Sequence, residues 1–370
     1  MIKIPNIVNK VAVHLNKFNF DTVIVGGYIR DQLLGFDSKD IDIEVYNVSS
    51  FNELKKSLSI FGDINEVGKK FGVLKLKIGE LDLDFSLPRT ERKVGLTHSE
   101  FEVTTHTKIT FKEASKRRDF TINSMGYNII TKEFLDPFNG NADLQSKSLK
   151  YVNENTFKED PLRILRAMQF CARFDFVCDS KLMDTCKTMV EDGELKHISK
   201  ERIFLEFEKL FLKASKPSIG IEILRDMNGF DHFSELKTLS KSELNRSLKT
   251  LDELCSYKSD DKLFLMFTML SYELKNIQLI NSFLNHFVDG KKLYKKVSKN
   301  ITFYKELNSL ELLVNRPKPF IQGRDLIAVG MKPSEEFAVF LDKLYIKQLK
   351  GEFNTKEEAI KYLSSLQLSN

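Results

Sequence analysis

Two pairs of aspartates, each with a spacing of two, are the residues in this sequence best suited to bind a metal ion. Asp40 and Asp42 lie in a stretch that alternates polar and apolar residues, and Asp82 and Asp84 repeat the spacing further along. Residues two apart in a strand point to the same face, so each pair can converge on one cation. If the two strands are neighbours, Asp84 can join Asp40 and Asp42 in a cluster. Carboxylate oxygens are hard ligands, so we expect the cation to be Mg²⁺.

A glycine turn and a short helix precede the first aspartate pair and supply its context. On its own, such a pair also occurs on ordinary solvent-facing strands. Gly26 and Gly27 allow a ligand to approach the backbone closely, the following helix N-terminus favours anions, and Arg30 lies one turn into that helix. A nucleoside triphosphate with Mg²⁺ satisfies all these features. The GxxxxGK[ST] motif of a Walker loop is absent from the sequence.

Residues 159–166 have the composition of a base-reading helix. Acidic residues and a proline open the segment, and a spacing of three places Asp160, Arg163 and Arg166 on one stripe. A fixed carboxylate accepts from the amino group of C or A, and a fixed guanidinium donates to a ring nitrogen or carbonyl, so U and G are disfavoured. The alternative is an ordinary surface ion pair. Upstream, Arg117 and Arg118 form an adjacent pair suited to phosphate.

The elements that must position these residues alternate between strand and helix at the start of the chain. We expect four strands and one short helix there, at residues 22–25, 40–46, 73–78 and 81–87 and at residues 28–34. From about Pro161 onward, amphipathic helical patterns follow one another. The sequence therefore predicts an α+β fold, in which a mixed sheet with flanking helices is followed by an all-helical remainder.

The composition excludes wholesale disorder and gives a mild basic bias. The 370 residues carry a formal net charge of +5, which is compatible with a polyanionic partner without requiring one. No apolar run approaches the roughly 20 residues that span a bilayer, so we expect a cytoplasmic protein with no membrane attachment. Lysine-rich residues 291–299 and 343–350 are either solvated helix faces or contacts to a nucleic-acid backbone. The cysteines show no CxxC pair and are expected to be buried free thiols.

Five segments together resemble the class II tRNA nucleotidyltransferases (CCA-adding enzymes) and related bacterial poly(A) polymerases of the DNA polymerase beta superfamily. They are GGYIRDQLLG with DID (26–35 and 40–42), RRDFTINSM (117–125), LDPFNGNADL (135–144), EDPLRILRAMQF (159–170) and ERIFLE (201–206). The resemblance covers about the first 230 residues, in order and with family-like spacing. It implies four parts: a nucleotidyltransferase head (1–145), a neck with the base-reading helix (146–215), a helical body (216–300) and a helical, tRNA-binding tail (301–370).

The resemblance also implies roles for individual residues. Asp40 and Asp42 match the metal ligands, and Asp84 matches the third acidic position of the catalytic set. The positions that match nucleotide-binding residues are Gly26, Gly27, Arg30, Arg118, Asp160, Arg163 and Arg166. Glu201 and Arg202 match a neck motif that orients the base-reading helix, for which a plain intrahelical network is the alternative. Gln169 stands where the family often has a third arginine, which argues against a phosphate contact at that position.

The activity that the resemblance implies is stepwise addition of C and A to the 3′ end of tRNA from CTP and ATP, with Mg²⁺ as cofactor and pyrophosphate released. The alternatives are a poly(A) polymerase, a CC-adding or A-adding specialist, an inactive RNA-binding protein and nucleotide transfer to a small molecule. Residues 92–115 are polar and are expected to form a mobile loop. In the family, this segment takes part in the switch from C to A, which favours a complete CCA-adding enzyme. The sequence assigns no oligomeric state.

Overall fold

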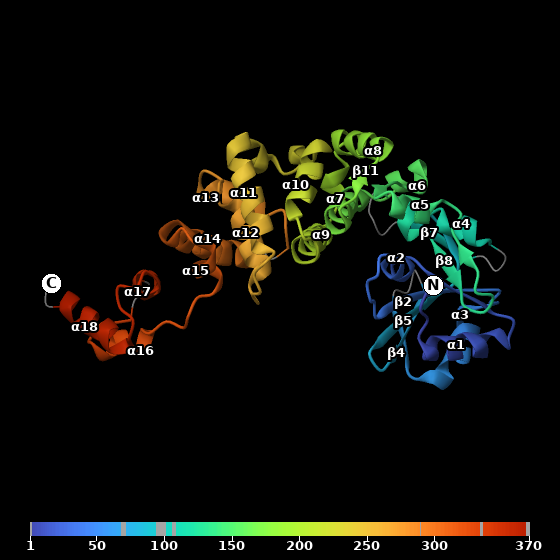
Figure 1. The fold of residues 1–370 in the computed structure, drawn as a ribbon, viewed down its shortest axis with the longest axis horizontal. Coiled ribbons are helices and arrows are strands. Elements are labelled where there is room, and N and C mark those ends of the chain that lie inside the picture. Colours follow the sequence, from blue (N-terminus) through green and yellow to red (C-terminus); the bar gives the residue numbers. More distant parts are fainter. Residues whose placement is uncertain are drawn as a thin grey trace. The chain divides into compact units, whose positions relative to one another are not determined.

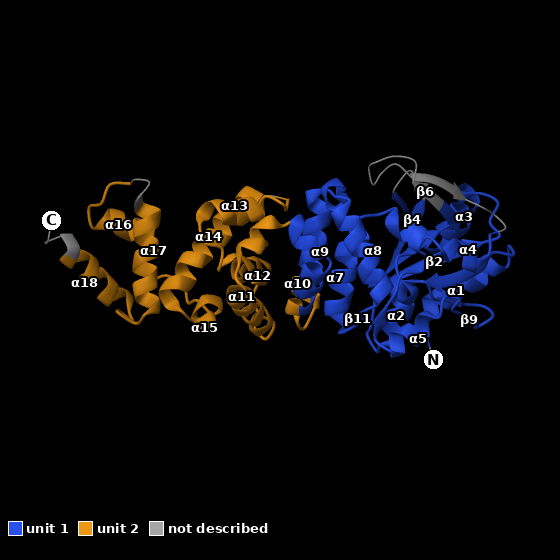
Figure 2. Cartoon of the chain, turned by 90° about the horizontal axis from the view of Figure 1, so that it is seen from above, with its two compact units in different colours: residues 1–210, 219–232 blue, residues 211–218, 233–370 orange. Residues whose placement is uncertain are grey.

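Figure 1 shows the computed structural model of the chain, which describes residues 2–67, 72–93, 101–105, 109–288, 290–333 and 336–367. The chain divides into two compact units (Figure 2). The first comprises Met1–Leu210 with Ile219–His232, and the second comprises Phe211–Ser218 with Phe233–Asn370. Among the helices of the described ranges, none combines the length and apolar character that crossing a bilayer requires. The division into head, neck, body and tail stays a prediction, because the two units follow a coarser boundary.

A seven-stranded mixed sheet forms the centre of the first unit. Its strand order is β3 (Ile64–Val67), β4 (Val73–Ile78), β5 (Leu81–Ser86), β2 (Asp40–Tyr46), β1 (Asp21–Val25), β8 (Gly126–Asn128) and β9 (Phe134–Leu135). β2 and β5 run parallel, and the remaining neighbours in this order pair antiparallel. The four predicted strands are therefore confirmed to within one residue at each end, and the α+β fold is confirmed with them.

Alternation along β2 separates a buried face of the sheet from a polar one. Ile41, Ile43 and Val45 are at most 1% exposed. Ile41 pairs with Leu83, and Ile43 pairs with Phe85, which are buried as well. The acidic residues of β2 occupy the positions between them and face the other way. The helices α1 (Asn6–Asn16), α2 (Gly27–Leu33) and α3 (Phe51–Leu58) belong to the same unit. Burial of one face thus fixes the register that aligns the acids on the other.

Residues 92–115 differ from the mobile loop expected from their composition. β6 (Arg89–Lys93) and β7 (Phe101–Thr105) pair antiparallel in a separate two-stranded sheet. α4 (Phe111–Ser115) follows, with a capping box between Thr110 and Glu113. Residues 94–100 and 106–108 of this stretch lie outside the described residues. The loop interpretation was wrong for these strands because β7 alternates Phe101 and Val103 with polar residues over a stretch too short to stand out, and the mostly charged β6 forms a strand by pairing with it.

Helices make up most of the chain after residue 150, as the periodicity predicts. In the first unit these are α6 (Glu154–Lys158), α7 (Leu162–Phe174), α8 (Ser180–Glu191) and the beginning of α9 (Lys200–Lys213), while a short parallel pairing joins β10 (Ser148–Leu149) to β11 (Val177–Cys178). α7 follows Pro161 and ends where Asp175 adopts a left-handed conformation with φ of 56°. Its apolar residues, including Ile164, Leu165 and Met168, are fully buried. That burial fixes the rotation of α7, and with it the direction of its polar stripe.

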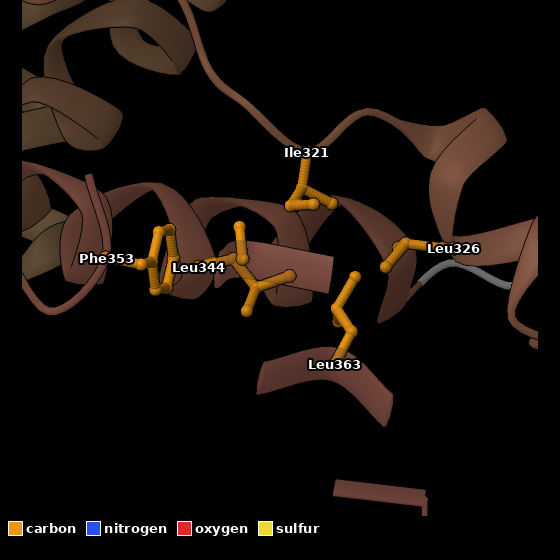
Figure 3. Packing of buried hydrophobic residues seen from close by; sticks show 6 residues of the cluster. Ile321, Leu326, Leu344, Phe353 and Leu363 are labelled. Carbon is orange, nitrogen blue, oxygen red and sulfur yellow. The ribbon is translucent and has the colours of Figure 1, made fainter. Parts of the chain in front are cut away.

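The second unit is helical throughout its described residues. Its helices include α11 (Lys241–Leu254), α12 (Lys262–Ser271), α13 (Ile277–Leu284), α14 (Gly290–Leu307), α15 (Leu310–Val314), α16 (Gly323–Ala328), α17 (Glu336–Leu349) and α18 (Lys356–Gln367). The last three enclose a small core of Ile321, Leu326, Leu344, Phe353, Ala359 and Leu363 (Figure 3). Several lysines of the two basic stretches form ion pairs, such as Lys299 with Asp342 and Lys350 with Glu306. These pairs favour the solvated-face interpretation for those lysines.

Candidate active site

The aspartates expected to bind metal lie on one face of the sheet, where β2 and β5 run side by side. The parallel register pairs Asp40 with Asp82 and Asp42 with Asp84. Side chains paired in this way share a face, with Cβ atoms about 5 Å apart. Asp40 and Asp42 are exposed, and Asp84 is partly buried. The expectation that the two strands are neighbours is thereby confirmed.

Asp84 lies between Asp42 on one side and a lysine on the other. Lys75 faces Asp84 across the β4–β5 pairing, and its Nζ lies 2.7 Å from Asp84 Oδ2. Within the described part of the chain, no three carboxylate, imidazole or thiol side chains converge on a single metal position. The expected three-carboxylate cluster is therefore not assembled in this structure, where Asp84 is paired with Lys75.

The electrostatics around Asp42 nevertheless suit a cation. The side chain is open to solvent, but the protein around it raises the pKa of Asp42, and the carboxylates of Asp84, Glu44 and Asp40 raise it further against the opposing effect of Arg118. Asp84 Oδ1 is buried and has no hydrogen-bond partner among the described residues. A buried carboxylate oxygen without a donor, beside a crowded acid, is the environment in which a divalent cation is a suitable partner.

The turn between β1 and α2 brings the backbone against these side chains. Gly26 has φ of 70°, which favours glycine. A Cβ at this position would lie 3.0 Å from Arg118 Nη1 and 3.9 Å from Asp42 Oδ2. The Gly26 amide donates to the carbonyl of Met125 at 3.2 Å, which ties the turn to the segment that follows Arg118. Glycine is required here by conformation and by space, and Gly26, Asp42 and Arg118 meet at one point.

Arg30 is placed differently from a residue that contacts phosphate. Its guanidinium group donates to Asp31 at 2.8 and 2.7 Å and to Asn123 at 2.5 Å, and the residue is 5% exposed. It also lies over the rings of Phe170 and Phe174, at 5.1 and 4.9 Å from their centroids. The triphosphate contact of Arg30 stays a prediction, while the structure gives the residue a positioning role between α2 and α7.

Glu44 is a residue of this site that the sequence reasoning missed. It is 1% exposed, and its Oε1 accepts hydrogen bonds from Arg117 Nη2 at 2.8 Å and Arg118 Nη2 at 2.9 Å. Its Oε2 accepts one from the Tyr46 hydroxyl at 2.8 Å. The signal was available, because Glu44 continues the spacing of two that links Asp40 and Asp42.

Asp119 is a second missed residue, and it joins the head to the base-reading helix. Its Oδ2 accepts from Arg166 Nε at 2.7 Å, and its Oδ1 accepts from Asn123 Nδ2 at 3.0 Å. Burial opposes the charge on Asp119, but Arg166 and Arg163 outweigh it and lower the pKa to about 2. Arg166, expected to bind nucleotide, thus lies in an ion pair with the last residue of the Arg-Arg-Asp sequence.

Asp160 and Arg163 are both fixed by partners other than each other. Arg202 Nη2 donates to both oxygens of Asp160, at 3.1 and 2.8 Å. Arg163 donates to the carbonyls of Thr156 and Arg117, at 2.7 and 2.6 Å. The intrahelical alternative for Arg202 is therefore wrong, because its partner lies 42 residues away in sequence. The two base-reading candidates project from the same end of α7 with their orientations set by neighbouring elements.

Gln169 lies inside the protein. It is 1% exposed, and its Nε2 is a buried donor without an acceptor among the described residues. The expectation that Gln169 makes no phosphate contact stays a prediction.

Comparisons with known proteins agree with the pattern of this site. The family described as "Poly A polymerase head domain" matches residues 22–150, and the family described as "Probable RNA and SrmB- binding site of polymerase A" matches residues 175–240. The "Multifunctional CCA protein" of Psychromonas ingrahamii is 31% identical over 324 residues, which cover 82% of this chain and 76% of that protein. A protein of the same name from Pseudoalteromonas atlantica is 36% identical over 221 residues, so the chain spans about half of its length (52%) and the alignment covers 58% of this chain.

A solved structure shares the fold over nearly the whole chain. It is that of the Thermotoga maritima CCA-adding enzyme complexed with tRNA, with a TM-score of 0.68 and 20% sequence identity. The superposition covers 98% of this chain and 95% of that one. At this level of identity the likeness establishes the fold, and the chemistry rests on the residues described above.

Proposed function

Because the chain belongs to the family of CCA-adding enzymes and multifunctional CCA proteins, we propose that it adds C and A to the 3′ end of tRNA. It takes the nucleotides from CTP and ATP without a nucleic-acid template and releases pyrophosphate. The observation that carries the proposal is the meeting of Gly26, Asp42 and Arg118 around one Cβ position. A backbone turn, a carboxylate and a guanidinium at one point are suited to a nucleotide and its metal ion. tRNA as substrate also implies a cytoplasmic location.

Asp40 and Asp42 are the proposed ligands of Mg²⁺, with Asp84 as a third acid that Lys75 holds in this structure. An ion held by these residues would lower the pKa of the attacking 3′ hydroxyl and would neutralise charge on the phosphates. The protein supplies the rest by position. Arg118 is held at the glycine turn, where its charge can support the triphosphate, and the backbone at Gly26 and Gly27 leaves room for the ligand.

Asp160 and Arg163 are the proposed base readers. A carboxylate oxygen has more than one acceptor site, so Asp160 can accept from a base amino group while it accepts from Arg202. A guanidinium has five donors, of which Arg163 uses one on each Nη atom for the two carbonyls, so among the described contacts three donors remain for a base. Because both groups are held rigidly, a base that presents the wrong edge leaves a polar group unpaired. Residues 216–300 and 301–370 are the proposed body and tail that hold tRNA.

The test is a transfer assay with a tRNA transcript that lacks its terminal CCA. Labelled CTP and ATP are supplied separately and together, and an oligo(A) primer serves as the second acceptor. We expect two C residues with CTP alone and a complete CCA end with both. Extension of oligo(A) with ATP in preference to tRNA would favour a poly(A) polymerase, a reading that the head-domain family description also allows. Arrest after two C residues in the presence of ATP would indicate a CC-adding specialist.

A further inference from the structure

Glu44 lies on the strand that carries the proposed metal ligands, but its own carboxylate is not accessible to a metal ion. It lies on β2 at the same spacing as Asp40 and Asp42, yet it is 1% exposed whereas they are exposed. Both of its oxygens already accept hydrogen bonds, Oε1 from two arginines and Oε2 from Tyr46. A carboxylate in this state is occupied as an acceptor and closed to solvent. Its function must therefore be sought in the groups that it holds.

Glu44 forms two ion pairs inside the protein. Its Oε1 lies 2.8 Å from Arg117 Nη2 and 2.9 Å from Arg118 Nη2, and its side chain is 1% exposed. Arg117 and Arg118 are adjacent cations that repel each other. One carboxylate oxygen that accepts from both guanidinium groups allows them to lie side by side. Without the charge of Glu44, their present positions are electrostatically unfavourable.

The two arginines contact the two parts of the proposed active site, which are the Gly26 turn and the base-reading residue Arg163. Arg118 Nη1 lies beside the Gly26 turn and donates to the carbonyl of Asn123 at 3.3 Å. The carbonyl of Arg117 accepts from Arg163 Nη2, one of the two bonds that orient this base-reading candidate. Glu44 is thus bonded to the arginine at the nucleotide turn and to the arginine that abuts α7.

We propose that Glu44 is a positioning residue for the incoming nucleotide, which sets Arg118 at the triphosphate and, through Arg117, steadies Arg163 at the base. The proposal rests on the proposed function, because it assigns Arg118 and Arg163 to the nucleotide. It separates the three acids of β2 by role. Asp40 and Asp42 face the cation, and Glu44 faces the guanidinium groups.

The test compares Glu44→Gln with the wild-type chain. Glutamine keeps the shape and one acceptor oxygen but loses the charge, so Arg118 is no longer held at the turn. We expect the KM for CTP and for ATP to rise about tenfold, with a much smaller change in kcat. The affinity for Mn²⁺, measured by electron paramagnetic resonance, should fall by no more than about fivefold, the effect of losing one neighbouring negative charge. A much larger loss of Mn²⁺ affinity with unchanged KM would make Glu44 a metal ligand and overturn the proposal.

A buried carboxylate elsewhere in the same unit supplies the matched control. Asp143 is 5% exposed and accepts from Thr121 Oγ1 at 2.7 Å and Lys150 Nζ at 2.5 Å. Asp143→Asn should lower the melting temperature as Glu44→Gln does, and leave the KM for nucleotides unchanged. An equal rise in KM in both variants would show that Glu44 acts through stability alone and would overturn the proposal.

A double-mutant cycle with Arg118→Met keeps the proposal testable if one variant is unstable. If Glu44 acts through Arg118, the double variant should bind nucleotide as weakly as Arg118→Met alone. Additive losses would contradict this. Binding is followed with a fluorescent ATP analogue in the absence of tRNA, so the result does not depend on transfer. Failure of the wild-type chain to extend tRNA would refute the proposed function, whereas additivity in this cycle would refute the role of Glu44.

Discussion

The acids of β2 and the polar stripe of α7 are held in opposite ways. Asp40 and Asp42 are exposed and lie among other carboxylates, whereas Asp160 and Arg166 are each bound by an oppositely charged side chain. The difference fits the role proposed for each region. A cation site needs acceptor oxygens that the protein has left available, and a base-reading site needs donors and acceptors whose directions do not change.

The titration behaviour of the two regions shows the same contrast. Protein packed around Asp42 and its like-charged neighbours raises its pKa, whereas Arg166 and Arg163 overcome burial and lower the pKa of Asp119 to about 2. β2 therefore carries charge that is unfavourable without a cation, and Asp119 carries charge that the arginines of α7 already compensate. Unfavourable electrostatics at a defined strand pairing points to a ligand site, and compensated pairs fix the directions of polar side chains.

The largest effect is expected at the acids of β2, whose negative charges are not balanced by ion pairs. Asp42→Asn removes a proposed metal ligand and should lower the rate of C addition about 1000-fold. The melting temperature should stay the same or rise slightly, because the variant also removes repulsion from Asp84 and Glu44. Transfer of labelled CMP to truncated tRNA and thermal unfolding measure the two quantities.

Asp82→Asn is the matched control for this variant. Asp82 is exposed on the neighbouring strand and pairs in register with Asp40, but it is not among the proposed ligands. It should retain most of the activity. Comparable losses in Asp42→Asn and Asp82→Asn would mean that the acidic face acts only through its overall charge.

A smaller effect is expected at Arg202, which holds the carboxylate of Asp160 in a fixed direction. Arg202→Met releases Asp160 from its partner, so the carboxylate no longer has a fixed direction. We expect discrimination against UTP and GTP, as a ratio of kcat/KM values, to fall about 10- to 100-fold. Arg225→Met, which removes an exposed ion pair with Asp226, is the control and should leave selectivity unchanged. Unaltered selectivity in Arg202→Met would show that base choice does not depend on the orientation of Asp160.

The sequence predicts the strands of the head well because their signal is local. The alternation of residues 40–46 gives β2 with its observed ends, and the turn at Gly79 and Glu80 separates β4 from β5 as expected. The parallel pairing of Asp42 with Asp84 could be stated only as a condition, since nothing local specifies which strands become neighbours.

The partners of the candidate residues could not be predicted, because they come from distant parts of the chain. Asp160 meets Arg202 across 42 residues, and Glu44 meets Arg118 across 74. Helical periodicity favoured a pair between Asp160 and Arg163 because it sees only residues three or four apart. Arg30 shows the same limit, since its position in a short helix gives no sign that Phe170 and Phe174 cover it.

The stability of the contact between residues 117–125 and α7 should depend on the charge of Asp119. The folded-state pKa of about 2 lies below the ordinary value of 3.8, so the ionised form is favoured by folding. This contribution is fully present above about pH 4 and is lost as the pH falls towards about 2. It amounts to about 2 kcal/mol at neutral pH. Asp119→Asn should lower the free energy of unfolding by about that amount at pH 7, measured by urea denaturation, and by much less near pH 2.

Asp175→Asn is the control for the neck. Asp175 forms an exposed pair with Lys147 and has a left-handed backbone that asparagine tolerates. The change in unfolding free energy should lie within about 0.5 kcal/mol at both pH values. A pH-independent loss in Asp119→Asn would mean that packing, and not charge, accounts for the effect of that residue.

The smallest effect is expected at Lys75, whose ion pair with Asp84 lies among the acids of β2 and β5. Lys75 Nζ binds Asp84 Oδ2 at 2.7 Å, while Asp84 Oδ1 has no partner among the described residues. The lysine side chain is about half exposed, so the pair contributes little to stability, and Lys75→Met should change the unfolding free energy by less than about 0.5 kcal/mol.

Removing the ammonium group leaves the full negative charge of Asp84 facing Asp42. Mn²⁺ should then bind about two- to fivefold more tightly, as measured by electron paramagnetic resonance. Lys77→Met, on the same strand and 3.9 Å from Asp82, is the control and should have a smaller effect. Unchanged or weaker Mn²⁺ binding in Lys75→Met would place Asp84 outside the metal site and reduce the proposed ligands to Asp40 and Asp42.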